Sequence, residues 1–391
     1  MKSGLVALVL AYALSQFYRA FLPVLTPALG QDLGATASDL STASAAWFLV
    51  FAAMQIPVGA ALDRIGPRIT AVALFAIGGA GGALVFALAQ SPSQIILAMG
   101  LIGIGCSPVL MAAYYILAKT YSAAIFATLA GAILGLGTLG NIAGSAPLAW
   151  AAEALGWRGA MLGMAGLTLA VAAALWLFIA DPEKEEIQHR GSVLDLLRMP
   201  ILWPIFAMML INYAPAAALR GLWAGPYAAD VFGATALTIG NVTLLMGLVM
   251  VAGNFAVGAA DRFFGTRKWV IFWVVMTGIA ALFTLAALPA QNLWLSAALL
   301  AVVGFAGSTF PVLIAHGKAF FPPHLTGRGV TLLNLFGIGG AGIAQMASGP
   351  FHSVMTASHG TIGGYSWLFG AFGIAALIGA LVFLRAEDRI D

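Results

Sequence analysis

Long apolar runs separated by short polar segments extend along the whole chain. A run of about twenty apolar residues is long enough to cross the hydrocarbon core of a bilayer as one α-helix. The pattern therefore predicts an all-α membrane protein. The twelve predicted spans cover residues 5–28, 40–62, 69–89, 94–118, 123–150, 158–180, 201–228, 237–260, 269–289, 293–320, 329–351 and 364–385.

The longest polar segment lies in the middle of the chain. Residues 181–199 are rich in charged side chains and are too polar to enter the bilayer. Six predicted spans precede this segment and six follow it. The expected organisation is an N-terminal six-helix bundle over residues 1–180, a cytoplasmic linker over 181–199 and a C-terminal six-helix bundle over 200–391.

The composition agrees with a membrane protein and limits the other classes. Hydrophobic residues make up 62% of the 391 residues and charged residues 8%, whereas soluble domains have roughly 25% charged residues. Thirteen of the 17 lysines and arginines fall on alternate inter-span segments and the termini, which the positive-inside rule assigns to the cytoplasm. We expect a multi-pass protein of the bacterial inner membrane with both termini inside. The basic residues form no soluble cluster, so a nucleic-acid partner is not expected.

The two halves of the chain repeat one another at a nearly constant offset, which indicates an internal duplication. Tyr12 and Arg19 in the first span recur as Tyr213 and Arg220 in the seventh, 201 positions later. Parallel repeats of this kind predict a binding site where the halves meet, near the bilayer midplane. Two shorter repeats, at offsets of 199 and 203, are residues 34–37 with 233–236 and residues 108–110 with 311–313.

Arg19 and Arg220 each lie inside an apolar run, where a charge costs at least ~2.5 kcal/mol. Each arginine follows its tyrosine by close to two helical turns, so the two side chains share one helix face. All 14 acidic residues fall outside the predicted spans. We therefore expect water or an anionic ligand to compensate the arginines, because the guanidinium fork binds carboxylate or phosphate bidentately. The alternative is a structural role, in which the side chains snorkel to headgroups or bind backbone carbonyls.

Other polar and aromatic side chains in the spans are candidates for the same cavity. His316 is the only histidine inside a predicted span, and it is expected either to take a coupling proton or substrate, or to pack structurally. Lys318 is expected either to bind substrate or to snorkel to the cytoplasmic surface, and Trp223 either to line the cavity or to lie at the membrane interface. The candidate substrate-binding residues are Tyr12, Arg19, Gln55, Tyr114, Tyr115, Tyr213, Arg220, Trp223, His316, Lys318 and Asn334.

The loops that follow the second and eighth spans carry related sequences. Residues 59–68 read Gly-x3-Asp-Arg-x-Gly-x-Arg, and residues 258–268 hold a second copy that is one residue shorter between Gly and Asp. This signature resembles the loop motif of the major facilitator superfamily, and the resemblance covers the whole chain. It implies two pseudo-symmetric six-helix bundles and a loop that stabilises contacts between the halves in the outward-facing state; the alternative role of the loop is a positive-inside anchor. The residues concerned are Gly59, Asp63, Arg64, Arg68, Asp261 and Arg262.

The resemblance and the two arginines together predict secondary transport of a small anion by alternating access. The Tyr/Arg pairs are similar to the organophosphate:phosphate antiporter branch of the family, and the lack of an acid in the predicted spans favours exchange, while His316 leaves proton symport open. The expected partners are the anion, a coupling proton or counter-anion and the lipid bilayer, with the chain as a monomer. No enzymatic activity, cofactor or metal is expected, because the sequence has no HExxH, paired-cysteine or phosphate-loop motif, and the Gly-x-Gly-x-x-Gly sequence at 337–342 follows no strand. The alternative function is a proton-coupled exporter of hydrophobic or cationic drugs.

Overall fold

The computed structural model describes residues 2–120, 123–181, 193–322 and 325–389, which are helical apart from short connections. The prediction of an all-α protein is confirmed for these residues. The chain divides into two compact units, described separately below. The first, which contains the N-terminal half, comprises Met1–Ile187 and Ala236–Gly240, and the second, which contains the C-terminal half, comprises Gln188–Thr235 and Asn241–Asp391.

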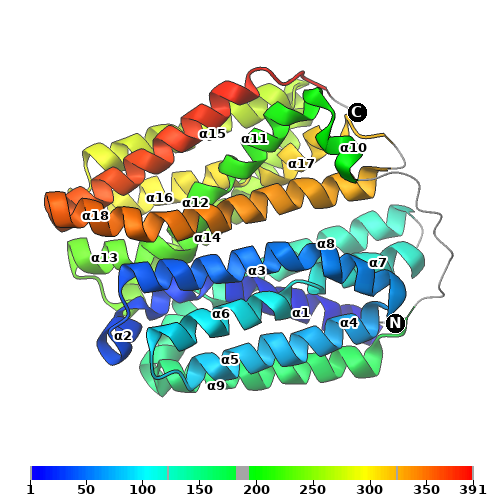
Figure 1. Cartoon of the computed structure of the whole chain (residues 1–391), viewed down its shortest axis with the longest axis horizontal. Helices are drawn as coiled ribbons and strands as arrows, with labels where there is room; N and C mark the ends of the chain where they lie inside the picture. The colour runs from blue at the N-terminus through cyan, green and yellow to red at the C-terminus, as the bar shows by residue number, and fades with distance from the viewer. Residues whose placement is uncertain (1, 121–122, 182–192, 323–324, 390–391) are drawn as a thin grey trace. The chain divides into compact units, whose positions relative to one another are not determined.

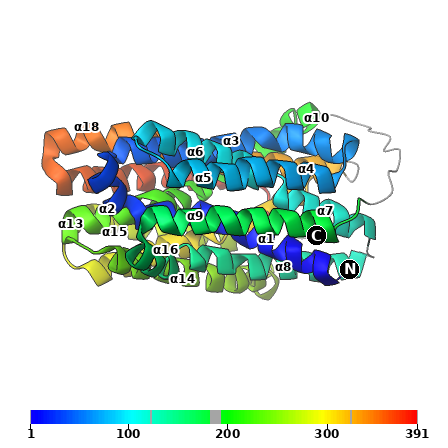
Figure 2. The same cartoon turned by 90° about the horizontal axis from the view of Figure 1, so that it is seen from below.

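The first half begins with a broken helix. α1 (Lys2–Ala20) and α2 (Leu22–Leu33) meet at an angle of 51°, so the first predicted span is bent. Pro23, in the first turn of α2, has no backbone N–H with which to continue the hydrogen bonds of α1, and the break falls at Phe21. The remaining helices are α3 (Ala37–Arg64), α4 (Pro67–Leu74), the π-helix η1 (Phe75–Ala80), α5 (Gly81–Ala87), α6 (Pro92–Cys106), α7 (Val109–Thr120), α8 (Ala123–Ala143) and α9 (Ala146–Phe178). Figure 2 shows α9 beside α5 and α1, with which it is in contact.

The second half repeats this arrangement with more interruptions at its start. The first span of this half, which is the seventh of the chain, is divided into short helices, and a π-helical turn, η3, carries Arg220. The helices are α10 (Val193–Leu197), the 3-10 helix η2 (Pro200–Leu202), α11 (Trp203–Asn212), α12 (Ala214–Ala218), η3 (Leu219–Trp223), α13 (Ala224–Phe232), α14 (Ala236–Phe264), α15 (Lys268–Ala287), α16 (Leu293–Gly307), α17 (Phe310–Lys318) and α18 (Thr326–Phe383).

Nine of the described helices are long and apolar enough to cross a membrane, or ten if α1 and α2 form one bent span. Two of them, α9 and α18, contain a glycine with non-helical backbone, Gly156 and Gly360 respectively. The chain reverses direction within α18, whose orange and red arms run back along one another in Figure 1. With α18 counted as two arms, and with α8 and the first arm of α9 as the fifth crossing, the described helices account for the twelve predicted spans.

The backbone repeats between the halves as the sequence does. All six glycines with positive φ in the described part of the chain fall at equivalent positions. Since φ values of this sign are available to glycine without steric strain, each half makes its special turns at the same places. The pairs are Gly34 with Gly233, Gly66 with Gly265, and Gly156 with Gly360.

Two further glycines bring helix backbones into direct contact. A Cβ at Gly140 of α8 would lie 1.7 Å from the carbonyl oxygen of Ala13 on α1. In the second half, a Cβ at Gly340 of α18 would lie 1.8 Å from the carbonyl oxygen of Leu210 on α11. Small residues permit this close approach of membrane helices. The glycine-rich sequence at 337–342 is therefore a helix-packing surface within α18.

Candidate functional site

Arg19 lies on the last turn of α1, over an aromatic surface of α3. Its guanidinium carbon is 5.2 Å from the ring centroid of Trp47, 6.0 Å from that of Phe48 and 5.7 Å from that of Phe51. The three aromatic side chains are buried, and Arg19 is half-buried. Its Nε atom has no hydrogen-bond partner among the residues that the structure describes. Cation–π contacts of ~0.5–2 kcal/mol hold the charge without using the N–H donor of Nε.

A buried amide joins the tyrosine and the arginine of α1. Gln16 donates a hydrogen bond from Nε2 to the hydroxyl oxygen of Tyr12, with a distance of 2.6 Å, and both side chains are buried. Gln16 follows Tyr12 by four residues and precedes Arg19 by three, so the three share one helix face. Gln16 was not among the predicted candidates, although this spacing was visible in the sequence.

Arg220 is buried in the π-helical turn η3, with 6% of its surface exposed. A Cβ at Gly247 on α14 would lie 2.8 Å from Nη2 of Arg220, so the guanidinium lies against the backbone of α14. A π-turn changes the direction of the side chains around it and is frequent at functional sites. The structure thus keeps this charge away from the lipid-facing surface, although it lies inside an apolar span.

A buried amide also lies beside the Tyr/Arg helix of the second half, but it comes from another helix. Gln345 of α18 donates from Nε2 to the carbonyl oxygen of Ala217, with a distance of 3.2 Å. Ala217 is equivalent to Gln16 at the offset of 201 that relates the arginines. Tyr213 is buried as well, with its ring centroid 5.0 Å from that of Phe310. Each half therefore combines a tyrosine, an amide and an arginine.

The remaining candidates of the first half lie on α3 and α7. Gln55 is buried and donates from Nε2 to the carbonyl oxygens of Phe51, at 3.1 Å, and Ser107, at 3.5 Å. It follows Phe51 by one turn, so it extends the helix face that carries the rings below Arg19. Tyr114 and Tyr115 are half-buried on α7.

His316 and Lys318 lie at the end of α17. His316 is fully buried, and its ring centroid is 5.4 Å from that of Phe320 and 5.7 Å from that of Phe383. Phe320 and Phe383 belong to the hydrophobic core of the second half, so His316 packs against that core. Lys318 is exposed.

Trp223 is fully buried in the second half, while Asn334 is half-buried on α18. The Trp223 indole donates from Nε1 to the hydroxyl of Ser348, with a distance of 2.9 Å. Its ring centroid is 4.7 Å from that of His352 and 6.1 Å from that of Tyr365. These contacts place Trp223 in an aromatic cluster that was not predicted from the sequence.

The first loop motif binds within its own half. The backbone N–H of Arg68 donates to Oδ1 of Asp181 at 2.8 Å, and its guanidinium donates to the carbonyl oxygen of Trp176 at 2.5 Å and lies 4.2 Å from the Trp176 ring centroid. The carboxylate therefore caps the N-terminus of α4, where the helix dipole favours negative charge. Asp181 had been expected to act only as the start of the linker.

The second motif has an equivalent cap. The backbone N–H groups of Lys268 and Arg267 donate to Oδ1 of Asp388 at 2.9 and 3.2 Å, and the Thr266 hydroxyl donates to Oδ2. Burial raises the pKa of Asp388, but these hydrogen bonds outweigh it and the pKa is lowered overall. In each half, one acidic residue that follows the last helix thus caps the N-terminus of the third span.

The other motif positions are described only in part. Gly59 is half-buried and Arg64 is exposed at the end of α3. The side chains of Asp63, Asp261 and Arg262 lie outside the described residues, so their predicted conformational role stays a prediction.

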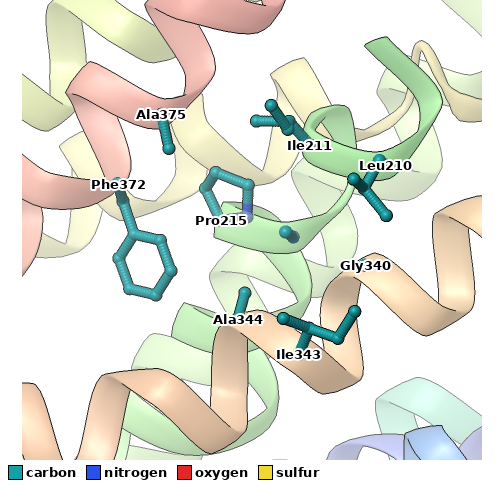
Figure 3. A pocket seen from close by; sticks show the side chains of 9 residues that line it. Leu210, Ile211, Pro215, Gly340, Ile343, Ala344, Phe372 and Ala375 are labelled. Atoms are coloured by element: carbon teal, nitrogen blue, oxygen red, sulfur yellow. The ribbon is translucent and has the colours of Figure 1, made fainter. Parts of the chain in front are cut away.

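A cavity of about 170 Å³ lies between α11, α12 and α18 (Figure 3). All of its lining residues are apolar, so it offers no charged or side-chain hydrogen-bonding group to an anion. No cluster of three His, Cys, Asp or Glu side chains suited to a metal ion occurs in the described part of the chain. The lining residues are Leu210, Ile211, Ala214, Pro215, Gly340, Ile343, Ala344, Phe372 and Ala375.

In the described part of the chain, nine or ten helices are long and apolar enough to cross a membrane, the backbone turns repeat between the halves, and each half has an arginine inside a span, as in a membrane transporter. The family described as the Major Facilitator Superfamily matches residues 8–222, more than half of the chain. The protein belongs to the Major Facilitator Superfamily. Its sequence matches none of the curated proteins with which it was compared.

Several solved transporters share this fold. A bacterial homolog of the human lysosomal transporter Spinster, in an inward-facing and occupied conformation, is 17% identical, with a TM-score of 0.80 over 97% of this chain and 95% of that chain. A mutant form of the nucleoside transporter NupG is 15% identical, with a TM-score of 0.75 over 98% of this chain and 99% of that chain. A D-xylose–proton symporter is 17% identical, with a TM-score of 0.77 over 96% of each chain. At these identities the likeness concerns the fold alone.

Proposed function

We propose that the protein is a secondary transporter of a small anion, such as an organic carboxylate or a phosphate ester. The observation that carries the proposal is the state of Arg19, whose guanidinium rests on three aromatic rings and whose buried Nε lacks a hydrogen-bond partner in the described residues. A guanidinium held in this way binds carboxylate or phosphate oxygens through charge-assisted hydrogen bonds. Arg220, buried in the equivalent span, supplies the second cation.

Alternating access follows from the chemistry of these two groups. An anion that contacts both arginines compensates two charges that the hydrocarbon layer disfavours. A ligand shifts a conformational equilibrium only through its different affinities for the conformers. In our proposal the anion binds most tightly in the conformer in which it can contact both Arg19 and Arg220. We place the protein in the bacterial inner membrane as a monomer with both termini in the cytoplasm, working by exchange or by ion coupling.

Export of hydrophobic or cationic drugs is the alternative proposal. Trp47, Phe48 and Phe51 form an aromatic surface that would suit a cation. Arg19 already occupies this surface, and a second cation beside it would be repelled. The structure therefore favours an anion over a cation in the first half.

A ligand screen on the purified protein identifies the anion. Phosphate, phosphate esters, mono- and dicarboxylates and sulfonates are added separately, and the apparent melting temperature is measured. A ligand present at 100 times its Kd stabilises the folded state by about 2.7 kcal/mol. The anion with the largest shift is then used, radiolabelled, for uptake into proteoliposomes.

Arg19→Gln and Arg220→Gln test the role of the arginines in that uptake. A hydrogen bond to a charged group contributes about 1.5–3 kcal/mol, so each variant is expected to lose at least about tenfold in uptake. Arg158→Gln is the matched control, because Arg158 is a partly exposed arginine that is paired with Asp32. Melting temperatures of all variants separate binding from folding. Full uptake by both Arg19→Gln and Arg220→Gln would refute the anion proposal.

A further inference from the structure

We propose that His352 in the second half binds a proton that is coupled to transport, with Asp230, held by a hydrogen bond from Tyr365, as the negative charge near it. The coupling role rests on the proposed anion function, whereas proton binding by His352 can be tested without any anion. The site was not predicted because His352 lies one residue beyond the predicted end of the eleventh span at residue 351. The helix α18 continues through that position, and His352 is 4% exposed.

The His352 ring contacts two aromatic rings that come from different parts of the second half. Its centroid is 4.7 Å from that of Trp223 at the end of η3 and 4.4 Å from that of Tyr365 on the second arm of α18. Faces of aromatic rings attract cations. A protonated imidazole is therefore accommodated in this cluster better than in an aliphatic core.

One nitrogen of His352 is available to a proton. Nε2 lies 3.4 Å from the hydroxyl oxygen of Thr356, one turn further along α18. Nδ1 is buried and has no hydrogen-bond partner among the described residues. In the tautomer that donates from Nε2 to Thr356, Nδ1 carries the free lone pair. A proton taken from the outer solution binds there and converts the neutral ring into an imidazolium.

Asp230 supplies a compensating charge that reaches solvent. It is exposed on the last turn of α13, because the seventh span extends to Phe232 rather than ending at 228 as predicted. The fully buried Tyr365 donates from its hydroxyl to Oδ2 of Asp230, with a distance of 2.6 Å. A negative charge close to an imidazole favours its protonated form. Figure 1 shows α13 at the end of the second half where the two arms of α18 meet.

Besides Asp230, the elements packed around His352 carry the titratable side chains of Tyr227, Arg220 and Tyr365. Tyr227 of α13 has its ring centroid 5.2 Å from that of Tyr365, and its hydroxyl lies 2.8 Å from that of Ser296 on α16. Arg220 lies on η3, three residues before Trp223. The second arm of α18 contributes Tyr365.

The cluster is joined to the candidate anion site through η3. Trp223, which contacts His352, ends the same π-helical turn that holds Arg220. A proton on His352 adds a positive charge to the half that contains Arg220, so proton and anion are expected to bind cooperatively. Such coupling is reciprocal: each ligand raises the affinity for the other by the same factor. The equivalent position in the first half is Ala149, at the offset of 203, so the proton site belongs to the second half alone.

Histidine NMR on the purified full-length protein tests proton binding directly. The chain has five histidines, so the ring resonances of isotope-labelled protein can be assigned by single His→Gln substitutions. The resonance lost in His352→Gln is expected to shift on acidification, as the ring takes up a proton. In Asp230→Asn and Tyr365→Phe its midpoint is expected to move to lower pH, because the carboxylate charge or its link to Tyr365 is lost. His359→Gln, which removes an exposed histidine beside Trp367, is the control and should leave the midpoint unchanged.

Proteoliposomes test the coupling, with inorganic phosphate and with the anion found in the ligand screen. Wild-type uptake is expected to alkalinise the outer solution and to rise as its pH falls. His352→Gln should lose both effects, while His359→Gln keeps them. A His352 resonance that does not titrate, or a pH dependence of uptake that is equal in the two variants, would overturn the proposal. If His352 titrates but no anion is transported, the proton site is supported and the anion proposal fails instead.

Discussion

The contact between Gly340 and Leu210 predicts that an added methyl group at residue 340 destabilises the second half. An alanine Cβ at position 340 would lie 1.8 Å from the Leu210 carbonyl oxygen, whereas ordinary contacts begin at 3.4 Å, so α18 and α11 must separate by the difference of about 1.6 Å. Overpacking of this kind costs about 1–3 kcal/mol. Alanine recovers up to about 1 kcal/mol through its higher helix propensity. We therefore expect Gly340→Ala to be destabilised by up to about 2 kcal/mol overall.

The neighbouring glycine provides the matched control. A Cβ at Gly339 has no atom within 4 Å, so Gly339→Ala gains helix propensity without a clash. Its apparent melting temperature in detergent should equal or exceed that of the wild type, while that of Gly340→Ala falls. Gly140→Ala, at the equivalent contact of the first half, should behave like Gly340→Ala. Equal melting temperatures for Gly339→Ala and Gly340→Ala would show that the two helices do not touch at this point.

Two further predictions concern the carboxylate cap and the helix reversal. Because the pKa of Asp388 is lowered in the folded protein, its stabilising effect is present above the unfolded value of about 3.9 and is lost as the pH falls through the folded value. Asp388→Asn should therefore have a lower melting temperature than the wild type at neutral pH and approach the wild-type value below about pH 4. Glu387→Gln, at an exposed residue, is the control. A difference in melting temperature between Asp388→Asn and the wild type that stays constant with pH would contradict the role of Asp388 as a cap. Gly360 has φ 74° and ψ 175°, a region restricted to glycine, so Gly360→Ala should lose about 1–3 kcal/mol of stability. Gly258→Ala, in a helix with open space around the added Cβ, should not lose stability. Equal melting temperatures for Gly360→Ala and Gly258→Ala would argue against strain at residue 360.

Much of the fold was predictable because bilayer thickness determines the length of an apolar run. The span positions and the repeat of the two halves followed from hydropathy and residue spacing. The ends of the spans did not, because helices continue past the last apolar residue. Asp230 and His352 were therefore placed outside the spans, although both lie on helices. The break at Phe21 depends on Pro23, which a hydropathy window does not detect.

The candidate site was predictable only along single helices. The shared face of Tyr12 and Arg19 follows from helical periodicity, and the same rule would have found Gln16. The rings below Arg19 could not be identified, because every predicted span contains aromatic residues and only the folded chain brings three of those on α3 beside Arg19. Gln345 reaches Ala217 from a helix more than a hundred residues away in sequence, which no local pattern indicates.

The caps formed by Asp181 and Asp388 bear on how the protein can be engineered. Each carboxylate holds the segment after the last helix of its half at the start of the third span. Both residues therefore have a structural role, although they lie beyond the last apolar run of their half. A fluorescent reporter or affinity tag inserted just before Asp388 would remove the carboxylate from the N-terminus of α15. The same tag joined after Arg389, whose guanidinium carbon lies 5.5 Å from the Phe320 ring centroid, would leave the cap of Asp388 on α15 in place.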